Sequence, residues 1–454
     1  MTLKSLTLEK HVHSIPVHVV TVANYPAWLE QQVPFIKTWL QASQFKAEPG
    51  MMRLLPDAAG KVEAVVVMVA SDTHFWGVGQ CALVLPEGDY HLVNASADHA
   101  LAWGLGAYQF TRYKKATREP ARLHCDLPDV LNQVESIYLV RDLINTPTED
   151  MLPSDLAFEA KQLTQDCGAK YHEIIGDDLL KQNYPAIHAV GRASADAPRL
   201  IDIRWGDASH PKITLVGKGV CFDSGGLDIK SASNMLLMKK DMGGAANVLG
   251  LARMIMKANL KVCLRVLIPA VENAIAGNAY RPGDVIKTRK GLTVEIGNTD
   301  AEGRVILADA LAEAASEKPA LIIDMATLTG AARVALGTEL PALFSNDLTT
   351  AQSTLQSCVK VQDEMWHMPL FAAYRESINS SIADLTNSPA EAYGGAITAA
   401  LFLNAFVPET IPWMHIDLMA WNLRARPGRP QGGEAMGVRG LYRYLADCFG
   451  FLKI

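Results

Sequence analysis

The chain has 454 residues, of which 49% are hydrophobic and 20% are charged, and this composition predicts a globular protein of about two or three domains. The formal net charge of -6, with no long block of like charge, argues against a protein built mainly to bind nucleic acid. Residues 1–18 lack the apolar core of a secretory signal, no apolar run reaches the ~18 residues of a membrane span, and the seven cysteines show no Cys-x-x-Cys spacing. We therefore expect a cytoplasmic protein that does not enter the membrane.

Residues 1–120 are predicted to form a smaller N-terminal α/β domain. Short runs rich in β-branched and apolar residues favour strands, and one apolar run has helical spacing. No catalytic constellation stands out in this part of the chain. Its predicted elements are strands at residues 18–22, 62–70 and 82–85 and a helix at residues 101–108.

A polar and basic stretch containing proline marks the end of this domain, as is common at domain boundaries. Residues 121–147 are predicted to form a linker and a connecting helix, which begins near Pro128 and stops before Pro147. Ser154 is expected to cap a second helix, and Gly168 to close it.

Residues 148–454 are predicted to form the larger domain. Here apolar strand-like runs alternate with helical segments, which is typical of a mostly parallel central sheet flanked by helices. The fold class is therefore α/β, and ligands of such sheets bind at the carboxyl ends of the strands. The predicted strands lie at residues 200–203, 213–216, 262–268 and 320–323, and the predicted helices at residues 245–255, 305–315 and 396–406.

Seven charged residues gather between positions 217 and 304 among glycines and apolar strands. Buried carboxylates are costly unless they are paired or bind a metal ion. Asp300 and Glu302 are two residues apart, so in an extended segment both side chains would face one site or bridge two cations. This pattern predicts a centre for two divalent cations. The seven residues are Lys218, Asp223, Lys230, Asp241, Asp300, Glu302 and Arg304.

Simpler interpretations apply to several of these residues and their neighbours. A lysine beside acids usually forms a salt bridge, although Lys218 lies between two glycines, where the backbone can bend tightly. Cys221 is expected to be a packing residue, Ser224 a structural one, and His415 a satisfied core histidine. The chain contains no His-Glu-x-x-His zinc motif and no complete P-loop.

The ordered motifs of this region resemble the leucine aminopeptidase family of two-metal exopeptidases. The family signature corresponds to Asn298-Thr-Asp-Ala-Glu-Gly-Arg, and the resemblance covers roughly residues 134–454. The accompanying motifs, in the family's order, are Gly217-Lys-Gly, Phe222-Asp-Ser-Gly-Gly, Ile229-Lys, Asp241-Met-Gly-Gly-Ala, Arg281-Pro-Gly-Asp and Ala326-Thr-Leu-Thr-Gly.

The resemblance implies a metal-dependent aminopeptidase that prefers Leu and other apolar N-terminal residues, with residues 148–454 as its catalytic domain. It implies that Lys230 polarises the scissile carbonyl and that Arg304 holds a bicarbonate acting as general base. The implied cofactors are two divalent cations per subunit, Zn²⁺, Mn²⁺ or Mg²⁺. The implied metal ligands are Lys218, Asp223, Asp241, Asp300 and Glu302, with Asp223 and Glu302 bridging the two ions. The implied substrate-binding residues are Met238, Thr327, Leu328, Gly330 and Met436.

The family also forms hexamers, as dimers of trimers, so the resemblance implies a homohexamer acting on peptides. Two alternatives remain open from the residues alone. One is a non-catalytic binding protein that has this fold. The other is a two-metal hydrolase acting on phosphate esters, since paired metals in carboxylate sites serve phosphatases as well.

Overall fold

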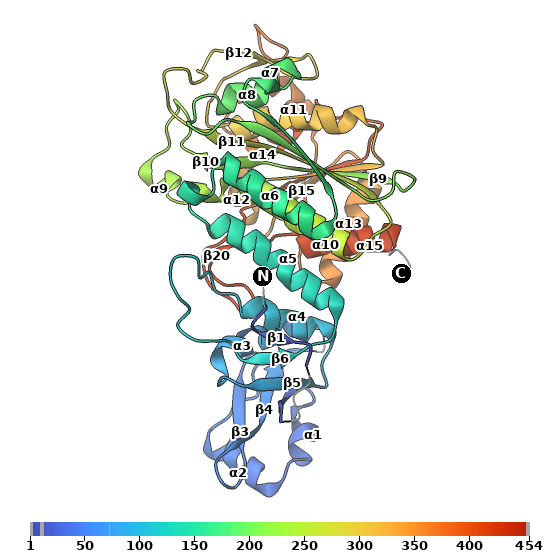
Figure 1. The fold of residues 1–454 in the computed structure, drawn as a ribbon. Coiled ribbons are helices and arrows are strands. Elements are labelled where there is room, and N and C mark those ends of the chain that lie inside the picture. Colours follow the sequence, from blue (N-terminus) through green and yellow to red (C-terminus); the bar gives the residue numbers. More distant parts are fainter. Residues whose placement is uncertain (1–2, 10–12, 72, 451–454) are drawn as a thin grey trace. The chain divides into compact units, whose positions relative to one another are not determined.

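The structure, a computed structural model, describes residues 3–9, 13–71 and 73–450 (Figure 1). The chain divides into two compact units, which are described separately. Unit 1 comprises Met1–Tyr138 and Leu423–Gln431, and unit 2 comprises Leu139–Asn422 and Gly432–Ile454. The division falls inside α5 (Pro128–Asn145), which matches the predicted connecting helix.

Unit 1 is an α/β unit in which six described strands form one sheet, in the order β1-β6-β5-β2-β4-β3. All neighbouring strands are parallel except β3, which runs antiparallel to β4. The strands are β1 (Leu6–Thr7), β2 (Ile15–Thr21), β3 (Met52–Pro56), β4 (Val62–Val69), β5 (Asp89–Val93) and β6 (Arg122–His124). The helices are α1 (Tyr25–Glu30), α2 (Pro34–Ala42), α3 (Cys81–Val84) and α4 (Ala97–Gly106).

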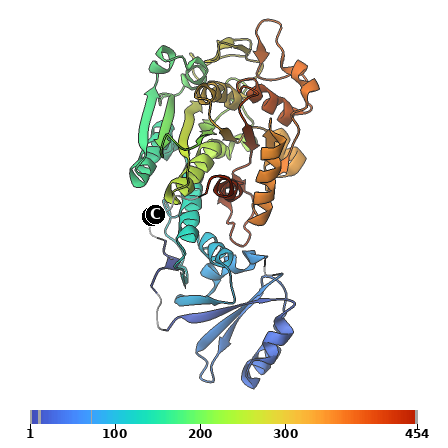
Figure 2. The ribbon, with the colours of Figure 1, turned by 90° about the vertical axis from the view of Figure 1, so that its right-hand side faces the viewer.

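Helices α1 and α2 lie along one face of this sheet (Figure 2), and their apolar side chains pack against it. Trp28 and Leu40 from the two helices share a buried cluster with Val66 and Met68 of β4. The apolar run that predicted β4 is buried from Val65 to Val69, and this helix layer covers one of its two faces.

One predicted strand of unit 1 is wrong. Residues 82–85 were expected to be extended, but they lie in and just after the helix α3. A four-residue apolar run carries too little periodicity to separate a buried strand from a buried helical turn.

In unit 2, nine described strands form the central sheet in the order β16-β15-β18-β14-β9-β11-β8-β7, with β10 paired to β11. The inner strands β18, β14, β9 and β11 are mutually parallel, whereas β15, β8 and β7 pair in antiparallel fashion towards the two sides. These strands are β7 (Lys170–Ile175), β8 (Arg199–Trp205), β9 (Lys212–Gly217), β10 (Gly219–Asp223), β11 (Cys263–Asn273), β14 (Leu321–Ala326), β15 (Ala342–Ser345), β16 (Trp366–His367) and β18 (Trp413–Asp417).

Smaller ladders and the helices complete unit 2. The short strands are β12 (Val285–Lys287), β13 (Thr293–Glu295), β17 (Leu385–Thr386), β19 (Trp421–Asn422) and β20 (Gly432–Gly433). The α-helices are α6 (Pro153–Cys167), α7 (Asp178–Lys181), α8 (Pro185–Gly191), α9 (Ala232–Met235), α10 (Gly243–Lys257), α11 (Glu302–Ser316), α12 (Gly330–Leu336), α13 (Leu348–Lys360), α14 (Gly395–Asn404) and α15 (Val438–Phe449). The 3₁₀ turns are η1 (Phe75–Gln80) in unit 1, and η2 (Thr148–Asp150), η3 (Met238–Met242) and η4 (Ala372–Ile378) in unit 2.

Helices cover both faces of this sheet (Figure 1). On one face, α8, α11 and α14 share a buried apolar cluster with strand residues such as Val216, Leu267 and Ile322. On the other, α10 packs against β9 and β14, and α6 and α15 pack against α10. The sequence prediction of a mostly parallel sheet flanked by helices, with a smaller N-terminal α/β unit, is confirmed.

The start of α6 differs from the prediction. The helix begins at Pro153, with Leu152 preceding it, so Ser154 lies inside the first turn, where its hydroxyl donates to Asp196 at 2.5 Å. Proline is well suited to the first helical position and sets the start there. Gly168 ends the helix with φ of +65°, as predicted. Among the described residues, no helix has both the length and the apolar character needed to cross a bilayer.

Candidate metal centre

The parallel strands bring their carboxyl ends together, and the predicted acidic residues lie there. Lys218 directly follows β9, and its N–H donates to the carbonyl of Met325 in β14 at 3.0 Å, while its own carbonyl accepts from Ala245 of α10 at 2.9 Å. A Cβ on Gly217 would lie only 2.7 Å from the Cα of Ala245. The glycine before Lys218 therefore allows α10 to approach the strand end and fixes the lysine's backbone.

Four carboxylates come from four different segments around this lysine. Asp223 ends β10, Asp241 lies in η3, Asp300 lies in the turn before α11, and Glu302 is the first residue of α11. Carboxylate oxygens of Asp223, Asp300 and Glu302 all lie within 4.8 Å of one another. The prediction of an extended Asp-x-Glu segment is wrong, because Glu302 begins a helix. The turn before this helix still brings the side chains of Asp300 and Glu302 together. The positive end of the helix dipole also favours a carboxylate at this position.

The two lysines bridge these acids. Lys218 Nζ lies 2.7 Å from Asp241 Oδ2 and 2.9 Å from Glu302 Oε1, and it donates to the carbonyl of Thr327 at 3.0 Å. Lys230 Nζ lies 2.7 Å from Asp223 Oδ2 and also pairs with Asp300. The sequence grouping of two lysines and four acids is therefore one continuous cluster in space.

The crowding of negative charge raises the pKa values of two of the acids. Burial and the charge of Asp223 raise the pKa of Glu302 to about 8 and that of Asp300 to about 6. Burial would lower the pKa of Lys218, but the surrounding carboxylates outweigh it, so the net pKa is raised. Lys218 therefore carries a proton in the absence of cations, and a metal ion would have to displace that proton in order to use it as a ligand.

The donor set fits divalent cations. Within the described chain, Glu302 Oε2 is buried without a hydrogen-bond partner, and three further buried oxygens have only their ion pairs with Lys218 or Lys230, namely Asp241 Oδ2, Asp300 Oδ1 and Glu302 Oε1. Buried polar atoms are normally satisfied, and carboxylates left over in this way are suited to metal ligation. Carboxylate oxygens are ligands for Mg²⁺ and Mn²⁺ and also bind Zn²⁺.

Asp223 is oriented by a residue that the sequence did not single out. Asn273, at the end of β11, donates to Asp223 Oδ1 at 2.8 Å and to the carbonyl of Thr299 at 3.0 Å, and the N–H of Gly225 donates to the same Oδ1 at 2.9 Å. The opposite oxygen of Asp223 is left facing Lys230. The sequence carried no signal for it, because the predicted strand ended at residue 268, whereas β11 continues to Asn273, which lies 50 positions from Asp223.

Comparisons with known proteins agree with this geometry. The profile of the cytosol aminopeptidase family, catalytic domain, matches residues 138–442, and the profile of the M17 aminopeptidase N-terminal domain matches residues 15–126. The chain belongs to the cytosol aminopeptidase family.

Individual members of the family are similar over most of the chain. Peptidase B of Cronobacter sakazakii is 44% identical over 324 residues, which is 69% of this chain and 76% of that protein. The crystal structure of the cytosol aminopeptidase from Coxiella burnetii has a TM-score of 0.95 and 50% identity, covering 98% and 99% of the two chains. The bottromycin maturation enzyme BotP in complex with Mn has a TM-score of 0.87 and 30% identity, covering 96% and 100%. This member of the cytosol aminopeptidase family is thus a peptide hydrolase.

In this aminopeptidase, Arg304 is the last residue of the signature and lies in the first turn of α11, two residues after Glu302. It is buried, and one of its Nη atoms donates to the carbonyl of Asn387 at 2.8 Å. Its Nε has no hydrogen-bond partner in the described part of the chain. Burial lowers the pKa of Arg304 to about 10, so the side chain remains a cation at neutral pH.

Asn387 was also missed by the sequence analysis. Its Nδ2 donates to the carbonyls of Asn298 and Ala301 at 2.7 and 3.2 Å, and its Oδ1 accepts from the N–H groups of Gly297 and Asn298. It therefore shapes the turn that carries Asp300. Nothing in the local sequence marks this residue, which lies more than 80 positions away.

Four of the predicted substrate-binding residues lie on two segments that a hydrogen bond joins. Thr327 Oγ1 donates to the carbonyl of Asp241 at 2.9 Å. Met238 opens the same 3₁₀ turn as Asp241, and Gly330 opens α12 just after Thr327. The N–H of Leu328 donates to Asp417 at 3.0 Å, so Asp417 fixes this loop. Asp417 is a further residue that the sequence analysis did not select.

The fifth residue, Met436, connects to this region through α10. Its N–H donates to Asn247 Oδ1 at 3.0 Å, and Asn247 Nδ2 donates to the carbonyl of Gly243 at 2.7 Å. A Cβ on Gly243 would lie 3.1 Å from Thr327 Cγ2. The backbone of Met436 is thus tied to the helix turn that contacts Thr327.

The simpler interpretations of Ser224 and Cys221 are confirmed, and that of His415 is met in part. His415 is completely buried and its Nδ1 lies 2.6 Å from Asp324 Oδ1, but its Nε2 has no hydrogen-bond partner within the described residues. Ser224 donates to the carbonyl of Asn273 at 2.6 Å, which is a structural contact. Cys221 is buried, and burial raises its pKa well above the ordinary value, so it is not a reactive thiolate.

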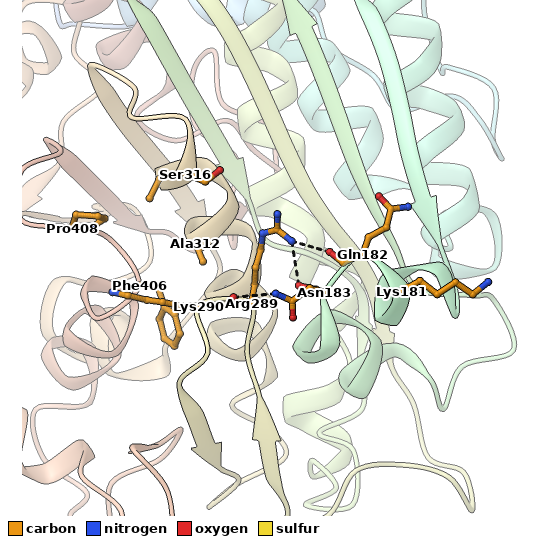
Figure 3. A pocket seen from close by; sticks show the side chains of 10 residues that line it. Lys181, Gln182, Asn183, Arg289, Lys290, Ala312, Ser316, Phe406 and Pro408 are labelled. Atoms are coloured by element: carbon orange, nitrogen blue, oxygen red, sulfur yellow. Dashed lines mark hydrogen bonds between the residues drawn. The ribbon is translucent and has the colours of Figure 1, made fainter.

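A separate cavity of about 620 Å³ lies between α7, α11 and the turn after β12 (Figure 3). Lys181, Arg289 and Lys290 line it, but each has a partner. Arg289 donates to the carbonyls of Gln182 and Asn183, Lys290 donates to a backbone carbonyl, and Lys181 pairs with an aspartate. Because these cations already have partners, this cavity is a weaker candidate for the functional site than the acidic cluster.

Proposed function

We propose that this chain is a metal-dependent aminopeptidase that binds two divalent cations per subunit and releases the N-terminal residue of peptides. The observation that carries the proposal is the buried carboxylate of Glu302, which lies beside those of Asp223 and Asp300. Within the described residues its Oε2 has no hydrogen-bond partner, and its Oε1 has only the ion pair with Lys218. The Mn complex of BotP, a relative with the same fold, supports manganese as one usable ion.

The proposed ligands are Lys218, Asp223, Asp241, Asp300 and Glu302. Asp223 and Glu302 have the central positions, since Asp223 is close to Asp300 and Glu302, while Glu302 also shares Lys218 with Asp241. This arrangement supports their role as bridging ligands. Bound divalent cations in pairs supply a water of lowered pKa and a Lewis acid for a carbonyl oxygen.

The proposed catalytic residues are the two remaining cations of the cluster. Lys230 is mostly buried, and its pKa is raised by Asp223 and Asp300 against the effect of burial, so it stays charged and can donate to the oxygen of the scissile carbonyl. Arg304 has an unused Nε donor and suits a small planar anion, which supports the proposed bicarbonate as general base. Bicarbonate would accept the proton from the attacking water.

The proposed pocket for the first side chain is formed by Met238, Thr327, Gly330 and Met436, with the backbone of Leu328 aligning the peptide. Methionine walls adapt to different apolar side chains, so Leu and other apolar residues are expected substrates. We further propose residues 1–120 as the N-terminal domain, 121–147 as the connection, and 148–454 as the catalytic domain of a cytoplasmic homohexamer.

The test is hydrolysis of leucine amide and leucyl dipeptides by protein stripped of metal and then reloaded with Mn²⁺ or Zn²⁺. The proposal expects activity only after reloading, together with about two bound ions per subunit by elemental analysis. Asp300→Ala and Glu302→Ala should each lose turnover while circular dichroism remains unchanged. Full activity of the stripped protein would refute metal dependence.

The same preparation tests the alternatives. Hydrolysis of p-nitrophenyl phosphate without hydrolysis of any dipeptide would favour a phosphoesterase. Tight ligand binding with no hydrolysis at all would favour a non-catalytic protein.

A further inference from the structure

Residues 224–230, here called the lysine loop, follow β10 and end at the lysine proposed to polarise the scissile carbonyl. The N–H of Lys230 donates to the carbonyl of Ser224 at 3.0 Å, so the loop folds back on its own start. Gly225 has a φ of +90°, and a Cβ there would lie 3.0 Å from Asp300 Oδ1 and 3.0 Å from the backbone nitrogen of Lys230. The loop is therefore tight, and it lies against the turn that carries Asp300.

The outer part of the lysine loop has few anchors. Its apolar side chains add little packing, because Leu227 is 42% exposed and Ile229 is 62% exposed. Among the described residues, every hydrogen bond that joins residues 226–229 to a segment outside the loop involves Thr299. Thr299 is completely buried and directly precedes Asp300. One residue of the signature thus holds this part of the loop from the protein interior.

Thr299 and Asp228 make reciprocal hydrogen bonds. The N–H of Asp228 donates to Thr299 Oγ1 at 2.9 Å, and the N–H of Thr299 donates to Asp228 Oδ2 at 2.7 Å. A threonine hydroxyl has a single proton, and the closest acceptor for it is the carbonyl of Gly225 at 2.6 Å, whereas Asp228 Oδ2 lies at 3.1 Å. The hydroxyl of Thr299 therefore both donates to the lysine loop and accepts from it.

Thr299 is itself fixed from the opposite side. Its carbonyl accepts from Asn273 Nδ2 at 3.0 Å and from the hydroxyl of Tyr280 at 2.5 Å, and both of these residues are buried. Asn273 is the last residue of β11, so the central sheet sets the position of Thr299. Through Thr299, the sheet also sets the position of the lysine loop.

The ion pairs of Lys230 do not replace this anchor. Its ammonium lies 2.7 Å from Asp223 Oδ2 and also pairs with Asp300. Both carboxylates are proposed cation ligands, and their oxygens would then be shared between the ammonium and the cations. A donor whose counter-charges are shared in this way depends on its backbone to keep its direction.

We propose that Thr299 and Asp228 are positioning residues that hold Lys230 where it can donate to the oxygen of the scissile carbonyl, an inference that rests on the proposed aminopeptidase function. A donor stabilises a developing oxyanion only when it is already in place, and a small misplacement is costly in rate. Loss of the Thr299 hydroxyl should therefore lower kcat and leave KM nearly unchanged.

The experiment compares two variants of the metal-loaded full-length enzyme with leucine p-nitroanilide as substrate. Thr299→Val removes the hydroxyl and keeps the shape of the side chain, whereas Thr299→Ser keeps the hydroxyl. Thr299→Val is expected to lower kcat by about tenfold or more, with KM changed by less than about threefold and with the number of bound cations unchanged by elemental analysis. Thr299→Ser should keep kcat within about threefold of the wild type. Asp228→Ala, at an exposed position, should also lower kcat and keeps the test decisive if Thr299→Val does not fold.

Thr293→Val is the matched control. Thr293 and Asp384 form the same kind of reciprocal pair, in which the N–H and the hydroxyl of Thr293 donate to Asp384 Oδ2 at 2.8 and 2.7 Å and the N–H of Asp384 donates to Thr293 Oγ1 at 3.0 Å. This pair joins β13 to the segment before β17. Its loss should leave kcat within about twofold of the wild type.

Hydrogen–deuterium exchange gives a readout that does not depend on activity. The amide of Asp228 is bonded to Thr299 Oγ1 and should exchange slowly in the wild type. The peptide that contains residues 224–230 should exchange about threefold faster or more in Thr299→Val, and at the wild-type rate in Thr293→Val. Equal exchange in all three proteins would overturn the role of Thr299 as an anchor.

The outcomes also separate this inference from the function on which it rests. A wild type that hydrolyses no aminoacyl substrate would overturn the proposed function itself. An active wild type with an equally active Thr299→Val would overturn only the positioning role. Loss of bound cations in Thr299→Val would do the same, because Thr299 would then act through Asp300. Added to Lys230→Met, Thr299→Val should cost less than about twofold more in kcat, and a further tenfold loss would show that Thr299 does not act through Lys230.

Discussion

Unit 2 contains two arginine–carboxylate ion pairs that have the same N···O distance but differ in burial. Comparing them tests how much burial contributes to the stability of the region near Met436. Arg141 Nε lies 2.9 Å from Glu434 Oε1, with side chains 1% and 6% exposed. Arg443 Nε lies 2.9 Å from Asp447 Oδ1, with side chains 50% and 39% exposed. The perturbation is Glu434→Gln, which removes the charge and keeps the shape.

The expected loss follows from burial. Leaving one partner of a buried pair uncompensated costs about 3–5 kcal/mol. A folded unit of roughly 300 residues has an unfolding entropy of about 0.6 kcal/mol per kelvin near its midpoint, so the Tm of unit 2 should fall by about 5–8 °C. Asp447→Asn removes an exposed pair worth less than about 1 kcal/mol and should shift the Tm by less than about 2 °C.

Thermal unfolding is followed by near-ultraviolet circular dichroism, in which the buried Trp413 reports on unit 2. A urea titration of both variants provides an independent midpoint. Burial is not the cause of the expected loss if Glu434→Gln shifts the thermal or the urea midpoint no more than Asp447→Asn does. Burial would then not be what makes the Arg141–Glu434 pair important.

Three further outcomes are expected. Lys240→Met should raise the free energy of unfolding, measured by urea titration, by about 1–3 kcal/mol, because it removes a buried charge whose nearest ion-pair partner, Asp241, is 3.8 Å away. A loss of stability would show that this ion pair outweighs the cost of burial. Asp324 raises the pKa of His415 above its ordinary value of 6.5, against the effect of burial. The stability from this pair should be fully present below about pH 6.5 and lost as the pH rises through the raised pKa. Unfolding of the wild type between pH 6 and 9 should therefore show a decline that Asp324→Asn lacks, and parallel curves would contradict it. Removing metal should lower the Tm by about 4 °C for each bound cation at cation concentrations near 100 Kd, and Glu302→Gln should abolish this difference.

The regular part of the fold could be predicted from the sequence because its signals are local. The predicted strand at residues 213–216 lies within β9, and the one at residues 320–323 overlaps β14. Helices cover both faces of these strands, so their side chains are continuously apolar. The run at residues 82–85 was misassigned because it lies in α3 and at its C-cap, and so short an apolar run does not distinguish a helical turn from a strand.

The candidate site could be predicted only where its residues form motifs. Lys218, Asp300 and Glu302 come from short glycine-containing segments, and the structure brings them into one cluster. Asn387 and Asp417 support that cluster through long-range contacts with backbone amides and carbonyls. No local pattern encodes such contacts, so they became visible only in three dimensions.

The lysine that follows β9 is held by main-chain packing as well as by its charge. The backbone of Lys218 hydrogen-bonds to β14 and to α10, and a single added methyl group at Gly217 would collide with main-chain atoms of α10. The position of this lysine is therefore fixed before any cation binds, so a change of its side chain alone would leave the contact between strand and helix in place.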